Sequence, residues 1–260
     1  MTELNGAIIS KSTEFPCSVK VLKSCSSTNT ALKNLAKSGT PEGVVFACEH
    51  QTAGRGRLGK SFYSPKGAGV YFSVLLRPTI SAQNAVFITI AAAVAVRRAI
   101  QKLLLLDTQI KWVNDIYYGE KKFCGILTES ALTPQGTLSY AVLGIGMNIL
   151  PPPDGYPNEF AFKTTNLQSM KNNLPEDIKN QLIAEILTQF YKLYQSLEEK
   201  EYLLEYKVAS CVIGKEIEIL TGPYRGNAQA LDIDENANLV VSLPNGETAV
   251  LSSGDVSIHL

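Results

Sequence analysis

The spacing of hydrophobic and polar residues predicts a mixed succession of strands and helices. Runs of β-branched and apolar residues indicate strands at residues 18–22, 44–49, 69–76, 109–112, 123–129 and 139–149. Apolar residues at helical spacing indicate helices at residues 30–37, over roughly twenty residues after Ser81, and from Pro175 to about Ala209. The first residues, about fifteen of them, read as a polar leader, and residues 154–173, which lack a clear period, read as a long surface loop.

The pattern changes at Val212. Short alternating runs separated by Gly222-Pro223 and Asn245-Gly246 are typical of successive hairpins. We therefore predict a small all-β barrel at residues 211–260 and a larger domain at residues 1–210. Together the patterns indicate an α+β fold in which helices flank a mixed β-sheet.

The composition argues against several classes of protein. Lys plus Arg and Asp plus Glu both number 24, so the net charge is zero and gives no overall attraction for nucleic acid or for an anionic membrane. The longest apolar run, residues 87–96, stops at Arg97 and Arg98 and is too short to span a bilayer, which predicts a buried helix. The N-terminal residues carry no export pattern, so we expect a cytoplasmic protein.

Cysteine and histidine usage argues against disulfide bonds and zinc. The five cysteines form no CxxC pair and are odd in number, which favours reduced, buried thiols over a disulfide framework. With two histidines besides, His50 and His259, a zinc cluster is not expected.

A glycine- and arginine-rich segment follows the strand predicted at residues 44–49. Residues 51–59, QTAGRGRLG, hold three glycines and two arginines. Glycine lets the backbone approach a ligand closely, and arginine forms bidentate, charge-assisted bonds with carboxylates and phosphates. The segment suits an anionic ligand, although a flexible, solvated basic turn has equal weight when the segment is taken alone. It contains neither a GxxxxGK[ST] phosphate loop nor a GxGxxG motif that opens a helix.

Polar residues near predicted strand ends supply further candidates. In Lys111-Trp112-Val113-Asn114-Asp115, Asp115 could hold Mg²⁺ on a nucleotide and Trp112 could pack on an apolar ligand face. Asn-Asp at a strand end is more often just a turn. Lys122 could neutralise charge on a phosphate or be a solvated surface lysine. Asn148 could contact a ribose or phosphate, or cap its strand.

These motifs occur in a specific order: SSTN, Q-x-x-GRGRxG, SPxGxxxYxS, KW-x-ND, K-x-x-GIL-x-E and G-x-G-x-N. The series, from about Ser26 to Asn148, resembles the catalytic domain of bacterial biotin protein ligases. The resemblance implies a class II synthetase-like catalytic domain at residues 1–210 and an SH3-like barrel after it. It also implies a two-step reaction, with ATP and Mg²⁺ as cofactors. Biotin and ATP give biotinyl-5′-AMP and pyrophosphate, and biotin then passes to a lysine of a biotin carboxyl carrier protein, as in acetyl-CoA carboxylase.

The resemblance also implies roles for individual residues. Biotin would be bound by Ser27, Thr28, Asn29, Gln51, Gly54, Arg55, Lys122 and Gly125. ATP or the adenylate would be bound by Arg55, Arg57, Trp112, Asn114, Asp115 and Asn148, with Asp115 organising Mg²⁺ through the nucleotide. The catalytic residues would be Arg57, Lys122 and Lys111. Arg55 is assigned to the carboxylate and Arg57 to the phosphate, and Glu129 is a weaker candidate.

Departures from the family pattern are few. Val113 stands where proline is frequent, Cys124 replaces a small apolar residue and Lys60 stands where arginine is frequent, so an active enzyme is expected. Fewer than thirty residues precede SSTN, where many bacterial relatives carry a helix-turn-helix domain. We therefore expect no DNA-binding repressor role. The resemblance also leaves open a homodimer formed through an exposed sheet edge, which no residue of the sequence decides.

Two other functions are compatible with parts of the pattern. Lipoate or octanoate ligases share the fold and also modify a carrier lysine. A non-catalytic, biotin-responsive binding module would keep the pocket without modifying a carrier, and the presence of Arg57, Asp115 and Lys122 argues against it.

Overall fold

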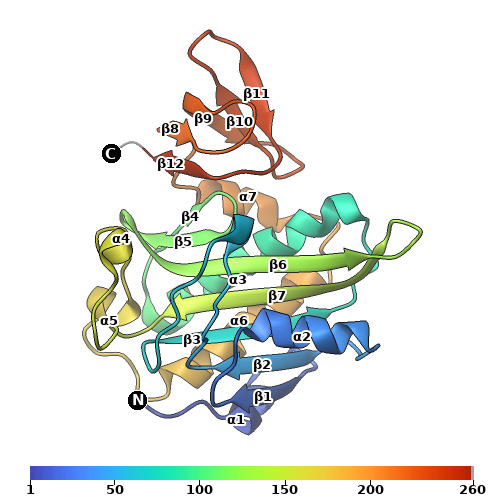
Figure 1. Cartoon of the computed structure of the whole chain (residues 1–260), viewed down its shortest axis with the longest axis vertical. Helices are drawn as coiled ribbons and strands as arrows, with labels where there is room; N and C mark the ends of the chain where they lie inside the picture. The colour runs from blue at the N-terminus through green and yellow to red at the C-terminus, as the bar shows by residue number, and fades with distance from the viewer. Residues whose placement is uncertain (259–260) are drawn as a thin grey trace.

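The computed structural model describes residues 1–258 and centres on a seven-stranded sheet (Figure 1). Its strands are β1 (Ser18–Leu22), β2 (Val44–Cys48), β3 (Gly69–Leu76), β4 (Gln109–Lys111), β5 (Asp115–Tyr118), β6 (Lys121–Leu132) and β7 (Leu138–Asn148). They lie in the order β1-β2-β3-β7-β6-β5-β4, with β1 and β2 parallel and all other neighbours antiparallel. The predicted mixed sheet is confirmed.

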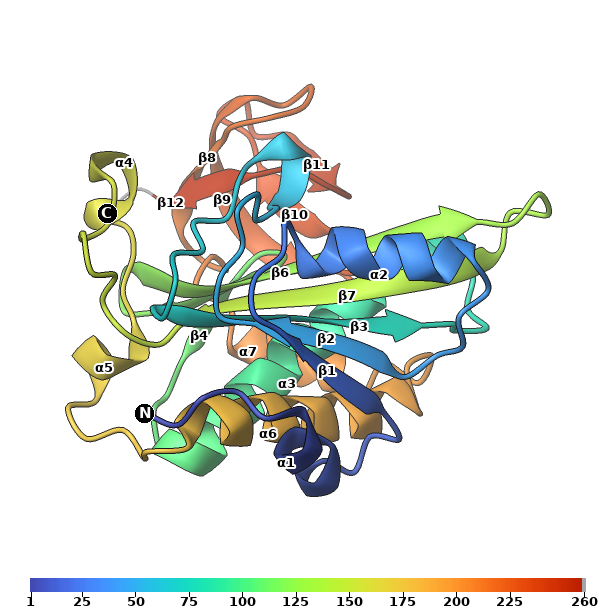
Figure 2. The same ribbon diagram turned by 60° about the horizontal axis from the view of Figure 1, so that its bottom comes forward.

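Helices cover both faces of this sheet (Figure 2). On one face, Leu32 and Ala36 of α2 pack against β3 and β7. The other face carries a larger core built with α3, which is buried along most of its length as its apolar run predicted. The helices are α1 (Gly6–Ser12), α2 (Thr28–Lys37), α3 (Val86–Leu104), α6 (Ile178–Tyr194) and α7 (Tyr202–Val208), with 3₁₀ turns η1 (Arg57–Gly59) and η2 (Ala82–Ala85). Among residues 1–258, no helix has the length and apolar character needed to span a membrane.

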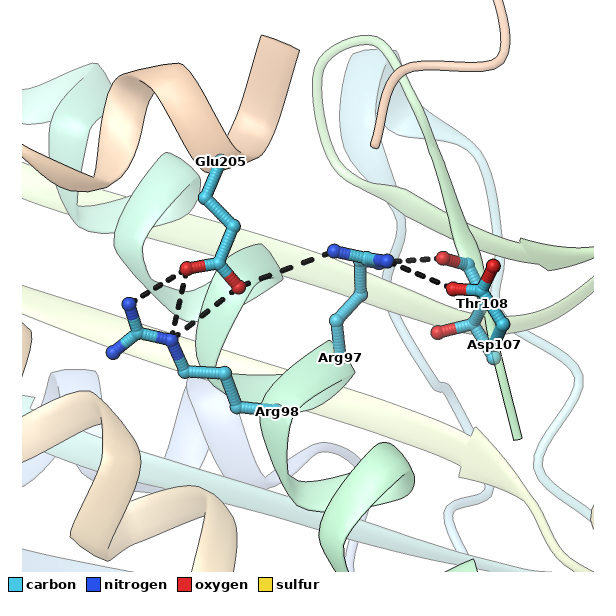
Figure 3. Close-up of polar contacts among 5 residues, drawn as sticks. All are labelled: Arg97, Arg98, Asp107, Thr108 and Glu205. Carbon is cyan, nitrogen blue, oxygen red and sulfur yellow. Dashed lines mark hydrogen bonds and ion pairs between the residues drawn. The ribbon is translucent and has the colours of Figure 1, made fainter. Parts of the chain in front are cut away.

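Two adjacent arginines of α3 fix its neighbours by ion pairing (Figure 3). Arg98 binds the Glu205 carboxylate on α7 through Nε and Nη2, the shortest contact being 2.6 Å. Arg97 Nη2 donates to Asp107 Oδ1 at 3.0 Å, and its Nε donates to the Thr108 carbonyl. Because Thr108 immediately precedes β4, these contacts help to set the position of that strand and of Lys111 at its end.

The C-terminal part forms a second, five-stranded antiparallel sheet, as predicted for a small β domain. Its strands are β8 (Glu216–Ile219), β9 (Gly226–Ile233), β10 (Leu239–Ser242), β11 (Thr248–Leu251) and β12 (Val256–Ile258), in the order β11-β10-β9-β8-β12. Alternate side chains of its strands are buried, which gives the sheet one apolar face. In the described residues β11 and β12 are not paired with each other. His259 and Leu260, the end of the predicted barrel, lie outside the described residues.

Three local predictions needed correction. The supposed polar leader contains α1, which Asn5 caps by accepting from the amides of Ala7 and Ile8, and which buries a single residue, Ile9. With a single buried residue, the helix has no hydrophobic periodicity that could be recognised in the sequence. The strand β5, between the strands predicted at 109–112 and 123–129, was missed because its four residues are too few to show an alternating pattern. The expected loop at 154–173 contains two four-residue helices, α4 (Asn158–Ala161) and α5 (Leu167–Met170).

Candidate active site

A cavity of about 740 Å³ opens where α2 begins, beside β6 and β7 and next to the C-terminal sheet. Eleven of the residues proposed from the sequence line it: Ser27, Thr28, Asn29, Gln51, Arg55, Arg57, Lys111, Asn114, Asp115, Lys122 and Gly125. They come from the start of α2, the glycine-arginine segment and the strands β4, β5 and β6. The fold therefore gathers motifs that are up to about a hundred residues apart in the chain.

One wall of the cavity is made by the start of α2 and by Gln51. Gln51 Oε1 accepts from the backbone amide of Thr28 at 2.9 Å and lies 3.3 Å from the Thr28 hydroxyl, while its Nε2 donates to Ser64 Oγ at 3.1 Å. Ser27 is the N-cap residue of α2, but its side chain makes no capping hydrogen bond. Hydroxyl and amide groups thus form a fixed polar surface here, suited to a neutral polar ligand group.

Glycines of β6 and β7 make the floor. A Cβ atom added at Gly146 would lie 2.7 Å from the ring of Phe62, and one at Gly125 would lie 3.0 Å from the same ring. Real Cβ atoms essentially never come as close as the Gly146 distance, and the Gly125 distance is tighter than most real contacts, so the position of Phe62 over these strands depends on the glycines. Phe62 was not proposed from the sequence, although glycine within a strand was a signal that something approaches closely.

The opposite end of the cavity holds a connected set of charged groups. Arg57 Nη1 donates to Asn114 Oδ1 at 3.0 Å, and Asn114 Nδ2 donates to Asp115 Oδ1 at 2.9 Å. Lys122 Nζ lies 2.7 Å from the same Asp115 oxygen. Burial lowers the pKa of Lys111, and the carboxylates of Asp115 and Asp255 partly offset this effect. Cations dominate this end, which favours the binding of an anionic ligand.

Arg55 is bound at a different place. Its Nη2 lies 3.0 Å from Glu129 Oε1, which also accepts from Lys33 Nζ at 2.7 Å. Burial alone would raise the pKa of Glu129, but hydrogen bonds from Lys33 and Asn29 and the charges of Lys33 and Arg55 hold it below its ordinary value. Glu129, a weaker candidate in the sequence, is therefore an ionised anchor for one of the two loop arginines.

The C-terminal sheet contributes to the same cavity. Lys215, Leu220 and residues 254–258 lie on its wall. Lys60, just after η1, forms an ion pair with Asp255, which connects the glycine-arginine segment to the turn before β12. The site is thus shared between the two sheets.

Comparison with known proteins identifies the family. Residues 21–148 match the family described as Biotin/lipoate A/B protein ligase. The biotin--[acetyl-CoA-carboxylase] ligase of Mycobacterium tuberculosis is 31% identical over 248 residues, which is 92% of this chain and 88% of the relative. The bifunctional ligase/repressor BirA of Bacillus subtilis is 32% identical over 233 residues, 88% of this chain and 70% of the relative. The chain belongs to the biotin protein ligase family.

Solved structures of this family have the same fold. The biotin protein ligase of Aquifex aeolicus in complex with biotin and ATP superposes with a TM-score of 0.75 at 22% identity, covering 93% of this chain and 98% of that one. The ligase of Leishmania major in complex with biotinyl-5-AMP gives a TM-score of 0.63 at 22% identity, covering 90% and 98%. At this level of identity, these likenesses show that the chain has the same fold as those two proteins.

Three residues proposed for ligand binding do not line the cavity. Trp112 is 4% exposed, and its indole Nε1 donates to the Ala237 carbonyl at 2.9 Å, so it joins the two sheets. Asn148 Nδ2 donates to the Thr165 carbonyl at 3.1 Å and holds the 156–166 segment. The Gly54 carbonyl accepts from the Phe62 amide at 2.9 Å, and a Cβ at Gly54 would lie 2.3 Å from the Phe62 carbonyl oxygen. The residues that hold these three, Ala237, Thr165 and Phe62, lie far along the chain or in irregular loops, so the sequence pattern could not reveal the contacts.

Proposed function

We propose that this chain is an ATP-dependent biotin protein ligase. It activates biotin as biotinyl-5′-AMP with release of pyrophosphate, and it then transfers biotin to a lysine of a biotin carboxyl carrier protein. One observation carries the proposal: a single cavity joins the polar wall at Thr28 and Gln51 to the charged set Arg57, Asn114, Asp115 and Lys122. Relatives named as biotin ligases match nearly the whole chain.

In the first step, a biotin carboxylate oxygen attacks the α-phosphorus of ATP and pyrophosphate leaves. Two anions must approach each other, so fixed positive charge and correct alignment supply most of the rate acceleration. Arg57 and Lys122 are proposed to carry that charge beside the phosphate, with Lys111 adding to the positive potential. Arg55 is proposed to move from Glu129 to the biotin carboxylate or the phosphate when the ligands bind.

Mg²⁺ would neutralise phosphate charge when bound with the nucleotide. Asp115 and Asn114 offer side-chain oxygens, the hard donors that Mg²⁺ prefers. The contacts from Asn114 and Lys122 both engage Asp115 Oδ1, which leaves Oδ2 for the cation or its water. Among residues 1–258, no group of three His, Cys, Asp or Glu side chains forms a metal cluster, so the residues fit a cation held mainly by the nucleotide.

In the second step, the neutral carrier lysine attacks the acyl carbon of the adenylate and AMP leaves. The activated ester is also open to attack by water, so the enzyme must cover it. The glycine-arginine segment and the C-terminal sheet, joined by Lys60 and Asp255, are proposed to form that cover.

Lipoate or octanoate ligation is not favoured. The relatives with broad coverage are named as biotin ligases, and the hydroxyl and amide wall at Thr28 and Gln51 would have no polar partner in an aliphatic acid. The carrier identity, a homodimer through a sheet edge and a cytoplasmic location stay predictions. Light scattering would test the dimer, and cell fractionation would test the location.

The direct test is to incubate the protein with biotin, ATP, Mg²⁺ and a biotin carboxyl carrier domain, then measure the carrier mass. We expect an added biotinyl group on one lysine, and none on a carrier in which that lysine is arginine. The same reaction with lipoate in place of biotin should give no product. Modification by lipoate alone would refute the proposed function.

A further inference from the structure

A chain of buried hydrogen bonds runs behind the cavity wall from Glu129 to Thr28. Asn29 Nδ2 lies 3.0 Å from Glu129 Oε2 and 3.2 Å from the Leu127 carbonyl oxygen. Asn29 Oδ1 lies 2.6 Å from Ser73 Oγ, which in turn lies 2.7 Å from Thr28 Oγ1. Thr28, Asn29 and Ser73 are at most 4% exposed, so these groups are satisfied mainly by one another.

The direction of each hydrogen bond in this chain follows from the chemistry of its ends. A carbonyl oxygen and an ionised carboxylate can only accept, so the Asn29 atom facing Leu127 and Glu129 must be the NH₂ group. Asn29 Oδ1 therefore faces Ser73, and the Ser73 hydroxyl must donate to it. A serine hydroxyl has one proton, so its short contact with Thr28 is satisfied when the Thr28 hydroxyl donates to Ser73 Oγ.

The same reasoning applies to the Thr28 hydroxyl. Its neighbours in the wall are Ser73 Oγ, whose proton is already used, and Gln51 Oε1 at 3.3 Å, which is an acceptor. The Thr28 hydroxyl therefore donates its single proton to one of these two protein oxygens. Thr28 lines the cavity, so what its hydroxyl oxygen offers to a ligand is a pair of unshared electrons, an acceptor for an N–H group.

The charge of Glu129 maintains this direction. Lys33 binds its carboxylate at 2.7 Å and keeps it ionised, and therefore unable to donate, whether or not Arg55, which lies 3.0 Å away here, stays in place. Space for the chain also depends on Gly144, because a Cβ there would lie 2.0 Å from Asn29 Oδ1. The acceptor at Thr28 thus depends on Ser73 and Glu129, which are not among the residues that line the cavity.

We propose that Ser73 and Glu129 are positioning residues that set the specificity of the ligase, because they present Thr28 as an acceptor for a ligand that carries an N–H donor. The proposal rests on the proposed function, in which the ureido group of biotin supplies that donor. A site built to hydrogen-bond a polar group rejects an analogue that lacks it, since the protein group is then left unpaired. An aliphatic acid of similar length has no such donor.

The test measures biotin-dependent exchange of labelled pyrophosphate into ATP for Ser73→Ala and Glu129→Gln. We expect Ser73→Ala to raise the KM for biotin roughly 10-fold, as for the loss of one well-placed hydrogen bond, with kcat and the KM for ATP within about 2-fold of wild type. Glu129→Gln should raise the KM for biotin by a similar factor. If Ser73→Ala does not fold, Glu129→Gln provides the test, because that side chain is 15% exposed and outside the core.

Two control variants match these changes away from the cavity. Thr89→Val removes a buried hydroxyl that pairs with Thr128 at 2.8 Å, and Glu185→Gln removes a carboxylate that is 13% exposed and paired with Lys102 at 2.8 Å. Both should keep the wild-type KM for biotin. An unchanged KM for biotin in Ser73→Ala and Glu129→Gln, or equal losses with biotin and ATP, would overturn the specificity role while leaving the ligase assignment intact. Failure of the wild type to catalyse biotin-dependent exchange would overturn the ligase assignment itself.

Discussion

Replacing Lys122 with methionine tests the charged end of the cavity. Lys122 lies in the cavity wall with Nζ 2.7 Å from Asp115 Oδ1, and methionine keeps most of its length and apolar stem while removing the charge. Its neighbour Lys121 is exposed and does not line the cavity, and successive residues of a strand point to opposite sides. Lys121→Met is therefore a matched control that removes the same charge one residue away.

The expected loss of activity follows from the charge separation. Two unit charges about 3 Å apart attract by about 5 kcal/mol at an effective dielectric constant of about 20. The Lys122 side chain is 30% exposed, so solvent screening reduces this, and we take about 3–4 kcal/mol as the part gained in the transition state. That corresponds to a loss of roughly 10²–10³-fold in the rate of adenylate formation. The ion pair itself should contribute about 1 kcal/mol or less to folding, because both partners are partly exposed.

Two measurements separate these effects. Single-turnover formation of biotinyl-5′-AMP should slow by that factor in Lys122→Met and stay within about threefold of wild type in Lys121→Met. Thermal unfolding of Lys122→Met should shift by only about 2–4 °C. A rate within threefold of wild type in Lys122→Met, or an equal loss in Lys121→Met, would refute the placement of Lys122 beside the phosphate.

Four further predictions follow from the site. Arg57→Ala should raise the activation free energy of adenylate formation by about 2–4 kcal/mol, and an unaffected single-turnover rate would contradict its role. Gly146→Ala should raise the KM for biotin about 10-fold, since the new methyl displaces Phe62; an unchanged KM would argue against a glycine floor. Folding lowers the pKa of Glu129, so the stability that its carboxylate gives the fold is present above the ordinary value of about 4.3 and is lost as the pH falls. The Tm difference between wild type and Glu129→Gln should therefore shrink from pH 6 to about pH 3, and a constant difference would contradict this. Biotin with ATP should protect the chain from proteolysis near Arg55, and equal cleavage with and without them would exclude ordering of that loop.

Local patterns in the sequence were sufficient for most of the fold. The strands at 18–22 and 69–76 agree with the structure at both ends, because their apolar runs are bounded by polar or turn residues. Elements with one or two buried residues, such as α1 and β5, leave no period to detect. The domain boundary predicted at residues 210 and 211 stays a prediction.

For the site, the sequence predicted which side chains gather in the cavity for most of the proposed residues, while their roles stay predictions. Arg57, Asp115 and Lys122 lie together in the cavity as their charges suggested. Trp112 and Asn148 do not line it, because their positions are decided by partners that lie far along the chain or in an irregular loop, Ala237 and Thr165. Ser73 is the last residue of the SPxGxxxYxS motif, but no role could be predicted for it, since a serine within an apolar strand gains meaning only when the residues beside it in space are known.

The burial of Trp112 gives this protein an internal optical probe. It is the single tryptophan of the chain, and its indole bond to Ala237 spans from the end of β4 to the turn between β9 and β10. Its emission should be blue-shifted while the C-terminal sheet is docked and shift to the red when water reaches the ring. Fluorescence would thus follow separation of the two sheets, while far-ultraviolet circular dichroism follows the helices around the seven-stranded sheet. A fluorescence transition at a lower temperature than the circular dichroism transition would show that the C-terminal sheet leaves the cavity before the seven-stranded sheet unfolds.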